Sequence, residues 1–100
     1  MKPPRIQNIN GKNGPAKNQF EIFTEDGKYF QSYSTIIAFK PYDFLAGYYG
    51  VDPGKTIIDK NWDYSRTTTK YLNRFLGTAG KAEIEKRIKS GDYAIADLNA

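Results

Sequence analysis

Three basic side chains, Arg66, Lys70 and Arg74, follow one another at intervals of four residues. In a helix this spacing places them on one face as a stripe of positive charge. Such a stripe suits contacts with phosphates, and Lys12 and Lys17 add charge near the N-terminus, where the first 20 residues hold no acid. These five residues are the candidate nucleic-acid contacts, although a merely solvated surface would give the same pattern.

A second group of candidate residues is aromatic and lies in the segment 41–55, which is rich in tyrosine and glycine. Its rings are Tyr42, Phe44, Tyr48 and Tyr49. Aromatic side chains dominate many protein interfaces, and a long loop without periodicity is uncommon in a compact domain unless it has a function. We expect these rings either to bind a protein partner or to cover the small core as a lid.

The chain contains no Cys and no His, which removes thiolate nucleophiles, disulfides, zinc fingers and histidine acid–base chemistry. The glycine-containing segments 11–14 and 47–54 lack the spacing that cradles phosphates. Asp59 and Asp63 are a weak ligand set for a hard cation. We therefore expect no catalytic residue, no metal and no cofactor, and a binding protein rather than an enzyme.

The length of 100 residues limits the chain to one domain. The formal net charge is +4, and two basic segments flank an acidic one. No apolar run is long enough to cross a bilayer and the start has no secretory pattern, so we expect a cytoplasmic protein. We divide it into a basic N-terminal arm and loop at 1–17 and a single α+β domain at 18–100, with the aromatic loop inserted at 41–55.

Alternating apolar residues predict a strand over 18–24, and the turn dipeptide Asp26-Gly27 predicts a hairpin to a second strand over 28–33. The turn-rich run 10–15 predicts a loop. The remaining strands are expected at 5–9, 36–39, 56–59 and 92–98.

A helix is predicted over 66–76, with Ser65 as its N-cap and Gly77 just past its end. A second helix is expected to start at a Thr78 cap and to end near Lys89. The fold class is therefore α+β, a small antiparallel sheet with two helices packed on one side. The expected shared core comprises Phe20, Ile22, Leu72, Phe75, Ile84 and Ile88.

The spaced elements FQSY at 30–33, WDYS-TT-KY at 62–71 and FLG at 75–77 carry a resemblance. Over about Asn18 to Asn99 the chain resembles a family of small, functionally uncharacterised proteins of tailed bacteriophages and prophages, from which it departs in the loop 41–54. The resemblance implies a phage or mobile-element origin and a role inside the infected host cell, and it supplies no catalytic residues. From the residues themselves, Trp62 and Tyr64 are expected to hold the following helix onto the sheet.

Charge and aromatic content together favour a noncatalytic, phage-type accessory protein that binds nucleic acid or a nucleic-acid-handling complex. In that hypothesis the basic residues contact phosphates and exposed tyrosines stack on unpaired bases. The alternative is a protein-binding inhibitor of a host enzyme or host defence, such as an anti-CRISPR, that uses the aromatic loop.

Overall fold

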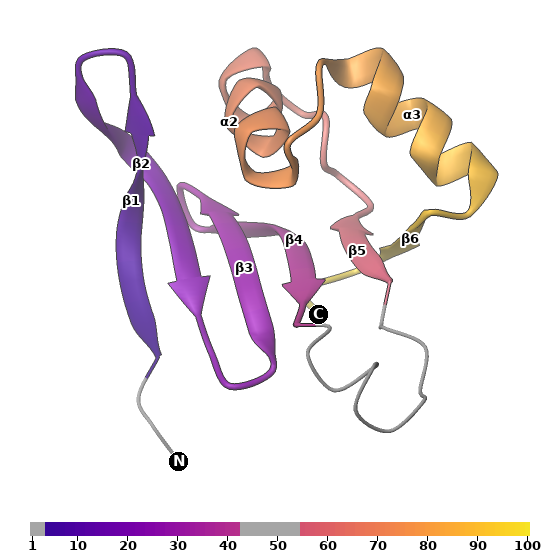
Figure 1. Ribbon diagram of the computed structural model, residues 1–100, viewed down its shortest axis with the longest axis horizontal. Coiled ribbons are helices and arrows are strands. Elements are labelled where there is room, and N and C mark those ends of the chain that lie inside the picture. The colour runs from indigo at the N-terminus through magenta and orange to yellow at the C-terminus, as the bar shows by residue number, and fades with distance from the viewer. Residues whose placement is uncertain (1–3, 43–54) are drawn as a thin grey trace.

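A computed structural model describes residues 4–42 and 55–100 of the chain. Within these ranges the protein is a small α+β fold, a six-stranded mixed sheet with two helices (Figure 1). The candidate residues Phe44, Tyr48 and Tyr49 lie outside the described ranges.

The six strands occur in the sheet in the same order as in the chain. They are β1 (Arg5–Gly11), β2 (Gly14–Phe23), β3 (Gly27–Ser32), β4 (Thr35–Pro41), β5 (Thr56–Asp59) and β6 (Tyr93–Ala96). All neighbours are antiparallel except β5 and β6, which are parallel. The expectation of a purely antiparallel sheet is therefore wrong at this pair, because the helices α2 (Arg66–Leu76) and α3 (Lys81–Ser90) return the chain to the same end of the sheet.

The N-terminal segment forms a β-hairpin where a loop was expected. β1 and β2 pair up to Gly11 and Gly14, which leaves only Lys12 and Asn13 at the tip. Gly14 has a φ of 113°, a backbone conformation that side chains with a Cβ rarely adopt. The loop predicted over 10–15 is therefore wrong, because its turn residues close a tight hairpin that adds β1 to the sheet.

The predicted hairpin at Asp26-Gly27 is confirmed, since β2 and β3 pair on either side of it. β3 begins at Gly27, and the N–H of Thr24 donates to the Gly27 carbonyl at 2.8 Å. A Cβ on Gly27 would lie 2.5 Å from the Lys40 carbonyl oxygen in β4. Glycine therefore permits the close approach of two backbones as well as the turn.

One buried cluster joins the sheet to both helices. It is formed by Ile9, Phe30, Ile37, Ala38, Ile58, Trp62, Leu72, Phe75 and Ile84. The expectation is confirmed for Leu72, Phe75 and Ile84, and Ile88 packs against the cluster while partly buried.

Phe20 and Ile22 do not belong to the buried cluster, so this part of the predicted core is wrong. They are half-buried and line a shallow apolar depression with Ile6. In β2 the fully buried position is Gln19, which pairs with Ser32 across the sheet. Alternation separates two faces but does not say which one is buried, and a polar residue occupies the inner face here.

The start of α2 agrees with the sequence, whereas the start of α3 does not. Ser65 is the N-cap of α2, and its Oγ accepts a hydrogen bond from the Thr68 N–H at 3.1 Å. Gly77 follows the helix in the left-handed conformation. The N-cap of α3 is Gly80, so the prediction of a Thr78 cap is wrong, because the Thr78 hydroxyl donates instead to Asn73 Oδ1 at 2.6 Å.

Candidate nucleic-acid interface

The predicted basic stripe lies on α2. Arg66, Lys70 and Arg74 are all exposed, while Leu72 and Phe75 of the same helix are buried in the core. The helix contacts β2 and β3, and Phe75 stacks on Phe30 of β3 with 5.7 Å between ring centroids. Core packing therefore fixes which side of α2 carries the charge.

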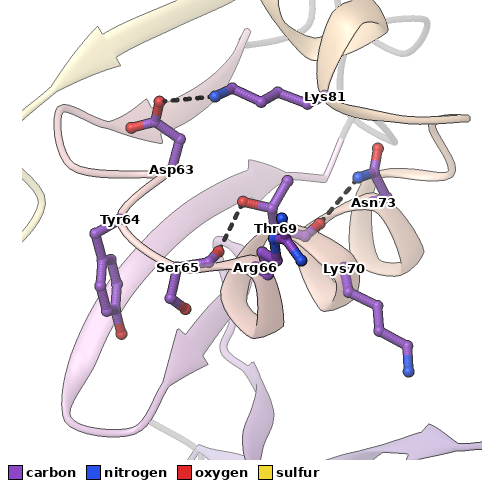
Figure 2. Close-up of a pocket in the computed structure, with 8 residues that line it drawn as sticks. All are labelled: Asp63, Tyr64, Ser65, Arg66, Thr69, Lys70, Asn73 and Lys81. Carbon is purple, nitrogen blue, oxygen red and sulfur yellow. Dashed lines mark hydrogen bonds and ion pairs between the residues drawn. The ribbon is translucent and has the colours of Figure 1, made fainter.

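Two of the three stripe residues line one depression, shown in Figure 2. Its volume is about 640 Å³, and its basic side chains are Arg66, Lys70 and Lys81. The other residues around it are Asp63, Tyr64, Ser65, Thr69 and Asn73. The depression thus collects side chains from the segment before α2, from α2 and from the start of α3.

The positive charges around the depression differ in how they are compensated. Lys81 forms an ion pair with Asp63 at 3.4 Å and lies 3.9 Å from a carboxylate oxygen of Glu85. Among residues 4–42 and 55–100, no carboxylate forms an ion pair with Arg66 or Lys70. Uncompensated positive charge at the depression therefore comes from these two exposed side chains.

Arg74, the third stripe residue, contacts the N-terminal hairpin. Its Nη1 donates to the Asn10 carbonyl oxygen at 2.5 Å, and its guanidinium lies 5.5 Å from the centroid of the Tyr71 ring. The tip of the hairpin is next to the same ring, because a Cβ on Gly11 would be 3.1 Å from the Tyr71 hydroxyl oxygen. Arg74 therefore holds the hairpin against α2.

The two N-terminal candidates have different surroundings. Lys12 is exposed at the hairpin tip, directly after the glycine that adjoins α2. Lys17 is exposed on β2, and it is not among the residues that line the depression. The hairpin therefore places Lys12 on an element beside the stripe and leaves Lys17 apart from it.

The rings of Trp62 and Tyr64 do not share a role. Trp62 is buried in the core cluster, which confirms the expectation for this residue. Tyr64 is 51% exposed at the edge of the depression, so the expectation that it would hold the helix onto the sheet is wrong. The segment between them runs across the surface, with the Asp63 carboxylate directed to Lys81 of α3.

A chain of three hydroxyl groups joins the edge of the depression to the sheet. The Ser65 hydroxyl donates to Thr68 Oγ1 at 2.9 Å, and that oxygen is 2.8 Å from Ser32 Oγ in β3. Thr69 and Asn73 are also tied to their own helix, through hydrogen bonds of 2.9 Å to the carbonyls of Ser65 and Thr69. The polar wall of the depression is therefore fixed before any ligand binds.

The remaining sequence candidates lie elsewhere. Tyr42 is 39% exposed after β4, and it lines a separate depression with Phe23 and Lys40. Asp59 is buried and accepts hydrogen bonds from the N–H groups of Asn61 and Leu98 at 3.0 and 2.9 Å. The Asp63 carboxylate is instead paired with Lys81. The structure therefore does not bring Asp59 and Asp63, the two candidate ligands for a hard cation, to one site.

Sequence reasoning did not identify Tyr64 and Lys81 as members of this site. Tyr64 stands just before the N-cap of α2, a position where an aromatic ring often packs against the helix. Lys81 is separated from the stripe by the turn between the helices, and only the packing of α3 brings it to Asp63. No local pattern indicates that contact.

Together, the fold and the depression define a small α+β protein with an exposed basic helix face. The chain belongs to DUF8033, a family of unknown function, whose model matches residues 5–91. That match includes the N-terminal hairpin, both helices and every residue that lines the depression. No curated protein and no solved structure matches the chain. Neither helix in the described ranges is long and apolar enough to cross a membrane.

Proposed function

We propose that this protein is a noncatalytic binding module that contacts nucleic acid, or a complex that handles nucleic acid, through the exposed face of α2. The observation that carries the proposal is the pair Arg66 and Lys70 on the rim of one depression, two exposed cations that pair with no carboxylate of the described residues. Cations of this kind bind phosphates with release of counterions, and the net charge of +4 favours the approach to a polyanion.

The N-terminal hairpin extends the proposed surface beyond the depression. Lys12 at its tip adjoins α2, and Arg74 lies between the hairpin and the rest of the stripe. The Arg74 guanidinium already donates to a backbone carbonyl, so we assign it the role of fixing the hairpin as well as adding charge.

We also infer that both helices cover the same face of the sheet and leave the basic surface on the outside. Phe75 of α2 and Ile84 of α3 belong to one cluster with Phe30 and Ile58 from two strands. In that arrangement the charged stripe is directed away from the sheet, where a large polyanion has access to it.

The proposal is tested with the double variant Arg66→Gln and Lys70→Gln, which keeps side-chain length and removes both charges. Binding of fluorescent DNA, single-stranded and duplex, is measured by anisotropy over a range of salt concentrations. We expect weaker binding and a salt dependence shallower by about two units in the logarithmic slope.

The matched control is Lys86→Gln with Lys89→Gln, which removes the same charge from exposed positions of α3. This control separates contact at the depression from the effect of net charge. Equal losses in the two double variants, or none in either, contradict the proposed site.

The alternative, a protein-binding inhibitor of a host enzyme or host defence, depends on the loop 41–55. Of its four candidate rings, only Tyr42 lies in the described residues, and it lines no part of the basic depression. A phage origin and a place in the host cytoplasm are parts of the proposal that rest on the sequence. Affinity capture from an infected host, with and without nuclease, distinguishes a nucleic-acid partner from a protein partner.

A further inference from the structure

Tyr64 is an exposed aromatic ring next to Arg66 and Lys70, which form no ion pair with a carboxylate in the described part of the chain. It is 51% exposed, whereas Trp62, two residues earlier, is buried. Figure 2 shows Tyr64 on one side of Arg66 and Lys70 on the other, around the same depression. The ring contributes little to the core, and at the edge of the depression its exposed face is accessible for stacking with a flat apolar group.

We propose that the depression binds unpaired nucleotides, with a base stacked on Tyr64 and the adjoining phosphates held by Arg66 and Lys70. This inference rests on the proposed function and adds the class of nucleic acid. Bases in a duplex are stacked on one another, so only an unpaired base presents a free face to the ring. Stacking on aromatic rings beside a positively charged groove is the general way in which proteins bind single strands.

The spacing of the two cations agrees with a single strand that runs along α2. Four residues of helix correspond to a backbone rise of about 6 Å from Arg66 to Lys70. The two long side chains on one helix face can therefore contact successive phosphates of one strand. Charge also limits where the phosphates can lie. At the other end of the depression the Asp63 carboxylate repels phosphates, although its pairing with Lys81 reduces this effect.

The local structure holds these groups in place before binding. The Ser65 hydroxyl caps α2 and donates to Thr68 Oγ1, which also contacts Ser32 of β3. Tyr64 and Arg66 are the direct neighbours of Ser65, so the backbone between the ring and the first cation is fixed. A site that is ordered in advance loses little entropy when a ligand binds.

The experiment compares Tyr64→Ser, which removes the ring, with Tyr64→Phe, which keeps it. The matched control is Tyr33→Asn, because Tyr33 is 50% exposed and does not line the depression. Anisotropy is measured with a labelled oligonucleotide as single strand and as duplex, and thermal melting checks that each variant is folded.

We expect the protein to prefer the single strand, and Tyr64→Ser to weaken that binding roughly tenfold or more. Tyr64→Phe and Tyr33→Asn are expected to keep the affinity of the parent protein. One set of results would overturn this inference and leave the proposed function intact. In it the protein binds single strand and duplex with equal affinity, Tyr64→Ser does not change that affinity, and Arg66→Gln with Lys70→Gln reduces it. Absence of binding to both forms would overturn the two together.

Discussion

Gln19 is a fully buried polar residue whose side-chain amide has no hydrogen-bond partner within the described residues. It lies beside Ser32 on the sheet face that contacts α2. Leaving a buried amide without partners costs about 1–3 kcal/mol, so this position lowers the stability of the fold. The hydroxyl chain of Ser32, Thr68 and Ser65 runs close by and gives the surrounding region its polar character.

At the scale of this residue, we predict that Gln19→Met stabilises the protein. Methionine has a similar length and no amide to desolvate, so the free energy of unfolding should rise by about 1 kcal/mol. Urea unfolding followed by circular dichroism measures the change. A decrease of similar size would show that the amide has partners in solution and would contradict the explanation.

The start of α3 is stabilised by a residue inside the helix. Its N-cap is Gly80, which makes no side-chain cap, and Glu83 accepts a hydrogen bond from the Ala79 N–H at 3.0 Å. The Arg87 Nε donates to the other carboxylate oxygen of Glu83 at 3.0 Å. The pKa of Glu83 is lowered, chiefly by the backbone hydrogen bond from Ala79 and secondly by the side-chain hydrogen bond from Arg87.

This element gives a prediction that depends on pH. The pKa of Glu83 is lower in the folded state than in the unfolded state. The Glu83 carboxylate therefore stabilises the fold at a pH above its unfolded-state pKa, and this stabilisation is lost as the pH falls through its folded-state pKa. We expect Glu83→Gln to lower the melting temperature at about pH 7 and the difference to shrink below about pH 4. The control Glu85→Gln, on the same helix, should lower the melting temperature by less at about pH 7. The prediction is contradicted if the difference in melting temperature between Glu83→Gln and the parent protein stays constant across this pH range.

Elements defined by neighbouring residues could be predicted from the sequence. The Asp26-Gly27 hairpin and α2, with Ser65 before it and Gly77 after it, depend on local turn and cap chemistry. The contact that adds Lys81 to the depression is not local, because Lys81 reaches Asp63 only through the packing of α3. The parallel pairing of β6 also depends on a crossover that no short pattern encodes.

At the scale of the whole molecule, the C-terminal residues link two neighbouring strands of the sheet that lie far from them in the sequence. The Asn99 side chain accepts a hydrogen bond from the Ile36 N–H at 2.8 Å and donates to the Ile36 carbonyl at 2.9 Å. Its Nδ2 is also 3.2 Å from an oxygen of the buried Asp59, which accepts in addition from the Leu98 N–H at 2.9 Å. One amide thus connects the start of β4 to the end of β5.

We therefore predict that Asn99→Ala destabilises the protein although the residue is exposed. The variant removes both hydrogen bonds between the Asn99 side chain and the Ile36 backbone, and it leaves the Asp59 oxygen with the Leu98 N–H as its remaining donor. We expect a loss of about 1–2 kcal/mol in the free energy of unfolding. Thermal melting measures it, with Asn61→Ala as a control that removes an exposed Asn side chain from the turn after β5. Equal melting temperatures for Asn99→Ala and the parent protein would show that the C-terminal link contributes nothing.

The parallel pairing of β5 and β6 also affects the order in which the molecule assembles. Successive strands from β1 to β4 pair with their immediate neighbours along the chain, whereas α2 and α3 lie between β5 and β6 in the sequence. Non-local pairing forms slowly, because loop closure must precede it. We therefore expect β6 to join the sheet last and to open before the other strands in native fluctuations. In such an opening we expect α2, which packs on β2 and β3, to keep its basic face, and α3, which contacts β6, to loosen.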